Sequence, residues 1–145
     1  MKNKGFTLIE LLAVIVVLGV IMTIAGVSVM KIRNDAALQE AKKLEDTIAD
    51  LGPGIYSNEV ITDDTSILNY DDMKLDSSKK ITLYELKDYL KELECDEKDK
   101  KCQIKSPFGN GYCDGYLEVK KTADGPSFKG YISCENYETE GYKQE

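Results

Sequence analysis

The chain has 145 residues, with 19 lysines and arginines against 26 aspartates and glutamates, a net charge of −7 and no histidine. The acidic balance argues against direct nucleic-acid binding, which depends on clustered basic residues, and the lack of histidine removes the commonest general base and metal ligand. The sequence contains no recognisable nucleophile–base pair and no phosphate-binding glycine loop, so we expect neither an enzyme nor a protein that needs a cofactor.

The first thirty residues join a short basic leader to a long apolar stretch. From Phe6 to Met30 the only ionisable side chain is Glu10. A helix of this length covers a hydrocarbon core of roughly 30 Å, so the sequence predicts a membrane-spanning helix. Lys2 and Lys4 precede it, and the positive-inside rule then places the leader in the cytoplasm and the chain beyond the helix outside.

Glu10 is unexpected in an apolar helix, because a carboxylate within a bilayer costs about 2.5–3.5 kcal/mol even on the lenient insertion scale. It lies near one end of the stretch, so one interpretation is that its side chain reaches the interface. The other is that it binds a positive partner when subunits associate. Cleavage after Gly5 would create such a partner, because the new α-amino group of Phe6 lies one helical turn from Glu10 and could pair with the carboxylate of a neighbouring chain.

The segment from Gly5 to Leu12, Gly-Phe-Thr-Leu-Ile-Glu-Leu-Leu, resembles the class III signal of type IV prepilins and of the pseudopilins of type II secretion and competence systems. The resemblance implies that a prepilin peptidase cuts between Gly5 and Phe6 and methylates the new Phe6 amine. It also implies that Glu10 helps to recruit subunits, this chain and other pilins, into a helical filament on an inner assembly platform.

The same resemblance implies a chain in three parts: a cytoplasmic leader over residues 1–5, which is removed, a transmembrane and filament-core helix over 6–30, and an extracytoplasmic pilin-like globular domain over 31–145. The protein would lie in the cytoplasmic membrane, with its C-terminus outside, before assembly and on the cell surface afterwards. Its function would be that of a major or minor pilin in a type IV pilus. One alternative is a pseudopilin of a type II secretion or competence DNA-uptake system, and another is a membrane-tethered binding module that never polymerises.

Apolar residues continue at helical spacing beyond the membrane stretch. Steps of 4, 3, 4 and 3 residues separate Ala37, Ala41, Leu44, Ile48 and Leu51. This spacing predicts an amphipathic helix that buries one stripe of side chains and ends at Gly52-Pro53-Gly54. The stretch from Ile55 to Lys80 is rich in Asp, Asn, Ser and Thr, and we predict that it is mostly loop.

A second, shorter helix is predicted near the middle of the chain. Thr82 and Glu85 have the spacing of a capping box, and leucines follow at helical intervals, so we expect an amphipathic helix from about Leu83 to Leu93. Cys95 and Cys102 then enclose a charged surface loop.

Two strands are predicted after a turn at Ser106–Tyr112 that is centred on Asn-Gly. Apolar and polar residues alternate from Cys113 to Val119 and again from Phe128 to Cys134, with a turn at Thr122–Pro126 between them. The predicted fold class is therefore α+β and pilin-like. A long N-terminal helix, with a membrane half and an amphipathic half, packs on a small antiparallel sheet of three or four strands.

Four cysteines lie in the half of the chain that the topology places in an oxidising compartment, so we expect disulfide bonds. Folding the two strands about their turn brings Cys113 opposite Cys134, and of the three possible pairings we favour Cys113–Cys134 with Cys95–Cys102. The segment Gly130–Tyr142 also resembles pilin-like proteins of Gram-positive bacteria, and this resemblance supports neighbouring positions for the Cys113 and Cys134 strands.

No metal site is predicted from the sequence. The cysteine pairs have six and twenty intervening residues, which does not match the short Cys-x₂₋₄-Cys pairs of structural zinc sites. Asp114 and Asp124 could supply oxygen ligands to calcium, but they lack the dense ligand spacing of a dedicated loop. We therefore interpret both as ordinary turn aspartates.

Overall fold

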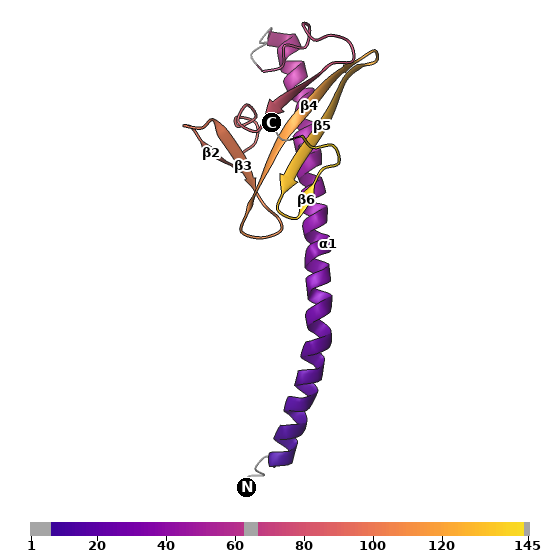
Figure 1. Cartoon of the computed structure of the whole chain (residues 1–145), viewed down its shortest axis with the longest axis vertical. Helices are drawn as coiled ribbons and strands as arrows, with labels where there is room; N and C mark the ends of the chain where they lie inside the picture. Colours follow the sequence, from indigo (N-terminus) through magenta and orange to yellow (C-terminus); the bar gives the residue numbers. More distant parts are fainter. Residues whose placement is uncertain (1–6, 63–66, 144–145) are drawn as a thin grey trace. The chain divides into compact units, whose positions relative to one another are not determined.

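The computed structural model describes residues 7–62 and 67–143, without the side chains of residues 24–28. A long N-terminal helix is followed by an antiparallel sheet, which confirms the predicted α+β class (Figure 1). The helix is α1 (Leu8–Thr62), and the strands are β1 (Ser78–Thr82), β2 (Leu93–Asp96), β3 (Lys101–Lys105), β4 (Tyr112–Thr122), β5 (Gly125–Cys134) and β6 (Tyr137–Glu138).

The chain divides into two compact units, Met1–Ala36 and Ala37–Glu145. Within the described residues, the first unit consists of the N-terminal part of α1, and the second contains the rest of α1 and all the strands. The predicted division into 1–5, 6–30 and 31–145 stays a prediction, because it rests on processing and on membrane insertion.

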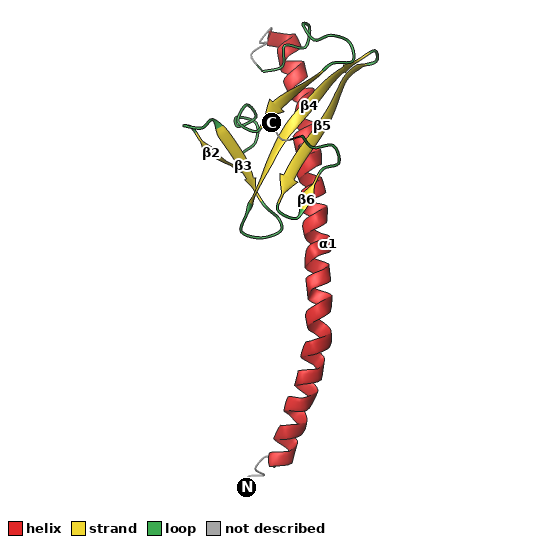
Figure 2. Ribbon diagram, in the orientation of Figure 1, coloured by secondary structure: helices red, strands yellow, loops and turns green. Residues whose placement is uncertain are grey.

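Strand β4 organises the sheet. One of its edges pairs with β5 from Asp114↔Ser133 to Thr122↔Gly125, and β6 pairs with the end of β5 (Figure 2). The opposite edge of β4 is shared, because β1 pairs with its later residues and β3 pairs with Tyr112 and Cys113 at its start. The two predicted strands are β4 and β5, and the described sheet is larger than the three or four strands expected.

The predicted end of the helix at Gly52-Pro53-Gly54 was wrong, because α1 continues to Thr62 with Pro53 inside it. A proline in a helix interior removes one backbone hydrogen bond and costs about 3 kcal/mol. Packing beyond the proline offsets this cost: Ile55 is only 3% exposed and extends the buried stripe of Ala41 and Ile48 by a further two turns. Tertiary burial therefore outweighs the local preference to stop.

Part of the predicted loop over Ile55–Lys80 was also wrong, since its first eight residues are helical and Ser78–Thr82 form β1. The helix end is tied to the loop by Glu59, a carboxylate that is only 8% exposed. Its two oxygens accept hydrogen bonds from the backbone N–H groups of Asn69 at 2.9 Å and Tyr70 at 2.5 Å. The buried charge is thus satisfied by backbone donors, which pins the loop to α1.

The predicted helix from Leu83 to Leu93 was wrong as well, although its capping box is present. Thr82 donates its backbone N–H to the Glu85 carboxylate at 2.7 Å, and the Glu85 N–H is 3.4 Å from the Thr82 hydroxyl. Turns occupy Leu83–Tyr89, and Leu93 already begins β2. Leu83 and Leu86 are buried in the core, at 2% and 0% exposure, and strand pairing begins at Leu93. Packing and strand pairing therefore outweigh the helical spacing of the leucines.

The backbones of α1 and β5 approach each other closely at Gly130. A Cβ atom built at Gly130 would lie 2.1 Å from the carbonyl oxygen of Glu45 and 3.1 Å from the Cβ of Ile48. Glycine is therefore required here by the helix–sheet distance. Around this contact Ile48, Leu117 and Ile132 are fully buried and form the centre of the core.

The side chain of Glu45 adds a polar link beside the same contact. Its Oε1 accepts hydrogen bonds from the Tyr137 hydroxyl at 2.7 Å and from the hydroxyl of Thr139. Burial, the hydrogen bond and the negative charge of Glu45 all disfavour the tyrosinate and raise the pKa of Tyr137 to about 12. The link therefore holds helix and sheet together through the neutral form of this tyrosine.

The glycine contact can be tested by two alanine substitutions. We expect Gly130→Ala to destabilise the protein by about 1–3 kcal/mol, because the new methyl group meets backbone rather than a movable side chain. Gly54→Ala is the matched control, since its Cβ would have no atom within 4 Å and should stabilise the helix by about 0.5–1 kcal/mol. Urea unfolding of the full chain in detergent micelles, followed by circular dichroism, measures the stability of both variants. Equal changes in the free energy of unfolding would contradict the close contact.

The Glu45–Tyr137 link predicts a specific dependence on alkaline pH. The pKa of Tyr137 is raised in the folded state from 10.0 to about 12, so its contribution to stability is complete below pH 10 and is lost as the pH rises towards 12. We expect Tyr137→Phe to lower stability by about 0.5–1.5 kcal/mol at neutral pH and to make the loss between these pH values less steep. Tyr89→Phe, at a partly exposed position outside this link, is the control. If stability falls between pH 10 and pH 12 as steeply in Tyr137→Phe as in the unaltered chain, the link is refuted.

Candidate functional site

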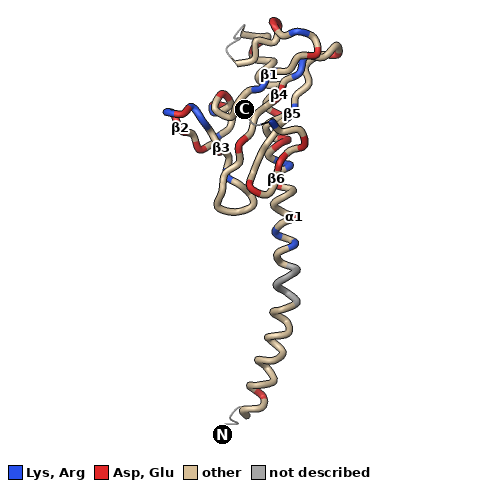
Figure 3. The backbone as a smooth tube through the Cα atoms, viewed as in Figure 1, with Lys and Arg blue, Asp and Glu red and all other residues tan. Residues whose placement is uncertain are grey.

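The first unit presents an apolar helix surface that no other described residue covers. Every side chain from Leu8 to Thr23 is solvent-exposed, with Leu8 at 81% and Ile15 at 60%. Figure 3 shows that this part of α1 is almost without charged residues. An exposed apolar surface of this extent is unusual for a soluble monomer and indicates an interaction site.

The structure describes no helix that combines the length and the apolar character needed for a membrane crossing. The predicted membrane-spanning helix over Phe6–Met30 therefore stays a prediction.

Glu10 belongs to a capping box at the start of α1. Its Oε2 accepts the backbone N–H of Thr7 at 2.9 Å and the Thr7 hydroxyl at 2.8 Å, while the Glu10 N–H lies 3.4 Å from that hydroxyl. The arrangement satisfies backbone donors that have no partner within the helix. Sequence reasoning missed it, although Thr7-Leu8-Ile9-Glu10 has the Ser/Thr-x-x-Glu spacing that signals such a cap.

The same geometry bears on the role expected for Glu10 in assembly. The structure places this carboxylate one turn into α1, with Oε2 occupied by Thr7. The predicted cleavage and methylation residues, Gly5 and Phe6, lie outside the described residues. The intermolecular pairing of Glu10 with a Phe6 amine therefore stays a prediction.

A comparison with protein families identifies the type of the N-terminal segment. Residues 1–26 match the family described as the prokaryotic N-terminal methylation motif. This segment is the type IV pilin and pseudopilin signal. The signal implies processing by a prepilin peptidase, anchoring in a membrane and later assembly at the surface, and it points to a structural subunit rather than an enzyme. Comparison with curated proteins and with solved structures gives no significant match.

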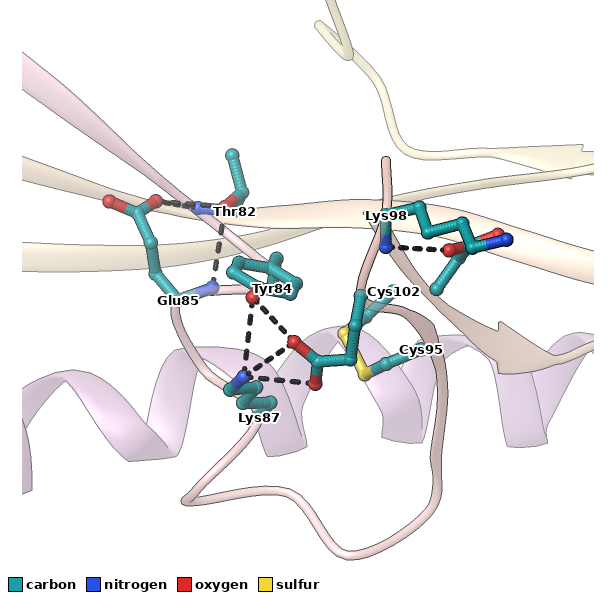
Figure 4. Close-up of a disulfide and its surroundings, with 9 residues drawn as sticks. Thr82, Tyr84, Glu85, Lys87, Cys95, Lys98 and Cys102 are labelled. Carbon is teal, nitrogen blue, oxygen red and sulfur yellow. Dashed lines mark hydrogen bonds and ion pairs between the residues drawn. A yellow bond between two sulfur atoms is a disulfide. The ribbon is translucent and has the colours of Figure 1, made fainter. Parts of the chain in front are cut away.

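The pilin signal covers only the first 26 residues, so the second unit is described from its own geometry. Its disulfides are Cys95–Cys102 and Cys113–Cys134, the pairs favoured from the sequence. The first closes the β2–β3 hairpin between directly paired residues (Figure 4), and the second ties β4 to the end of β5. Because all four cysteines are bonded, none offers the thiolate that a zinc site requires.

The two aspartates considered for calcium, Asp114 and Asp124, lie on different elements. Asp114 is on β4 and binds Lys101 Nζ at 3.2 Å and the Gln103 side-chain amide at 2.9 Å. Asp124 is exposed in the turn between β4 and β5. Among the described residues, no three His, Cys, Asp or Glu side chains are grouped in a way that could hold a metal ion.

Proposed function

We propose that this chain is a structural subunit, a major or minor pilin, of a type IV pilus. The observation that carries the proposal is the match of residues 1–26 to the methylation motif, directly ahead of an exposed apolar helix surface. In this proposal a prepilin peptidase removes residues 1–5, methylates Phe6 and releases a subunit whose helix can pack with those of its neighbours. A pseudopilin filament of a secretion or competence system is the alternative, because the motif is common to both groups.

The exposed side chains of Leu8–Thr23 need an apolar environment in two successive states. Before assembly the lipid of the cytoplasmic membrane supplies it, with one helix in the bilayer and the C-terminus outside. After assembly the same segments of neighbouring subunits supply it, so that the filament core replaces the lipid. The second unit stays in water in both states, which fits its acidic composition and its two disulfides.

Glu10 can serve its own helix and a neighbouring subunit at once. Both hydrogen bonds from Thr7 fall on Oε2, and no described residue donates a hydrogen bond to Oε1. The α-amino group of a neighbour's Phe6 could therefore bind Oε1 without disturbing the cap. A charge pair in an apolar filament core would specify the position of each new subunit, because a misplaced carboxylate would remain buried and unpaired.

Two substitutions separate the charge of Glu10 from its capping role. Glu10→Gln keeps an oxygen that can accept the Thr7 hydrogen bonds but removes the charge, since glutamine also occurs in capping boxes. Thr7→Val removes the hydroxyl and keeps the charge. We expect Glu10→Gln to reduce filaments sheared from the cell surface by at least about tenfold, because a buried amine left unpaired costs about 3–5 kcal/mol, and Thr7→Val to retain most of them.

Leader removal must be verified in each variant by its mass, so that a defect in processing is not mistaken for one in assembly. Normal filament yield in Glu10→Gln together with a loss in Thr7→Val would show that Glu10 acts through the helix cap and would contradict the charge pair. Normal yield in both would leave Glu10 without a role in assembly. A tethered module that never polymerises would give no filaments from the unaltered chain.

A further inference from the structure

A pocket of about 250 Å³ opens in the second unit where β1 and β3 separate along the same edge of β4. The pairing of β1 with β4 ends at Thr82↔Tyr116, and the pairing of β3 with β4 begins at Ile104↔Cys113. Asp114 and Gly115 lie between these two ladders and both line the pocket. The backbone of Asp114 faces β5, whereas Gly115 faces the fork without a β1 or β3 partner, so the Gly115 N–H and C=O can bind a polar ligand.

The charge of this fork pocket is opposite to that of the whole protein. Its lining contains four lysines, Lys80, Lys100, Lys101 and Lys143, and one carboxylate, Asp114, so it carries 4 − 1 = +3 on a chain of net charge −7. Lys101 pairs with Asp114 at 3.2 Å, whereas the other three lysines form no ion pair with a described carboxylate. Figure 3 shows basic residues at the β2–β3 hairpin, which supplies Lys100. The pocket is thus suited to an anion.

One wall of the pocket is a stack of tyrosine rings. Tyr116 and Tyr142 both line the pocket, with ring centroids 5.3 Å apart, and Tyr131, which is outside the lining, stacks on Tyr116 at 4.9 Å. Lys80 Nζ sits 4.5 Å from the centre of the Tyr116 ring and donates a hydrogen bond to the carbonyl of Lys143 at 2.9 Å. The Lys143 N–H in turn binds the Tyr116 hydroxyl at 3.1 Å. These contacts fix the wall before any ligand arrives.

Tyr84 also lines the pocket and is held in place by its neighbours (Figure 4). Its hydroxyl donates to Glu97 at 2.7 Å, and Lys87 Nζ lies 4.4 Å from the centre of its ring. The hydrogen bonds among these three groups lower the pKa of Glu97 and raise the pKa of Lys87, so both stay charged and the network persists at neutral pH. The pocket therefore combines aromatic side chains that are held in place with three lysines, Lys80, Lys100 and Lys143, that form no ion pair with a described carboxylate.

We propose that the fork pocket binds one residue of an acidic saccharide, a sugar that bears a carboxylate. Lys100 and Lys143 bind the carboxylate, the backbone of β4 at Gly115 binds hydroxyl groups, and a tyrosine ring packs on the apolar face of the sugar. The volume is slightly below that of sites for drug-sized ligands, which favours a single sugar ring. This inference concerns the second unit alone and does not depend on filament assembly.

The test uses two sugars that differ at one position. D-glucuronate and neutral D-glucose are titrated into the full chain in detergent micelles, and binding is followed by saturation-transfer NMR. We expect binding of glucuronate and at least about tenfold weaker binding of glucose, because the charged hydrogen bonds are absent from the neutral sugar. Lys100→Gln should weaken glucuronate about three- to tenfold, whereas Lys98→Gln, on the same hairpin but outside the pocket lining, should leave it unchanged.

Three results would overturn the proposal. Absence of saturation transfer to glucuronate would show that the pocket does not take an acidic sugar. Equal effects of Lys98→Gln and Lys100→Gln would show that the attraction is a general charge effect. Displacement of glucuronate by a short oligothymidylate that binds more tightly would assign the pocket to single-stranded nucleic acid instead. Tyr142→Ala provides a second check, since loss of the ring should weaken the binding of glucuronate. A cooperative unfolding transition in urea confirms that this variant is folded.

Discussion

The second unit depends on the close approach of α1 to β5, which only glycine at position 130 permits. Because the helix backbone lies directly against the strand there, Ile48 reaches the centre of the sheet and packs with the fully buried Leu117 and Ile132. The hydrogen bonds from Tyr137 and Thr139 to Glu45 form beside this contact. Farther along α1, Gly52 is packed against the ring of Phe128, and this second close approach keeps the helix on the sheet as far as the proline. The helix–sheet distance therefore determines both the core and the polar links around it.

Sequence patterns predicted the elements whose signals are local. The helical spacing from Ala37 to Leu51 and the alternation along β4 and β5 marked elements that the structure contains, and the position of Cys113 opposite Cys134 followed from that alternation. The errors arose where distant contacts outweigh local preference. Pro53 does not end α1 because Ile55 and Glu59 are buried beyond it, and the capping box at Thr82 starts only a turn because the chain must enter β2.

The candidate site was predictable to a different degree in the two units. In the first, Glu10 stood out as one carboxylate in an apolar stretch, yet its hydrogen bonds with Thr7 were overlooked although the spacing was readable. In the second, the fork pocket could not be predicted, because its residues come from β1 and the turn after it, the β2–β3 hairpin, β4 and the C-terminal segment. It exists because two strands share one edge of β4, a feature of sheet topology that no local pattern encodes. The proposed assembly and the proposed ligand binding thus concern separate units of one chain.

We propose that the chain is processed at its pilin signal and becomes a filament subunit. The motif over residues 1–26 and the uncovered apolar surface of Leu8–Thr23 both support this proposal. The intact mass of the protein sheared from the cell surface tests this most directly. We expect a chain that begins at Phe6 with one added methyl group. A surface-extracted chain that still carries Met1 to Gly5 would contradict it.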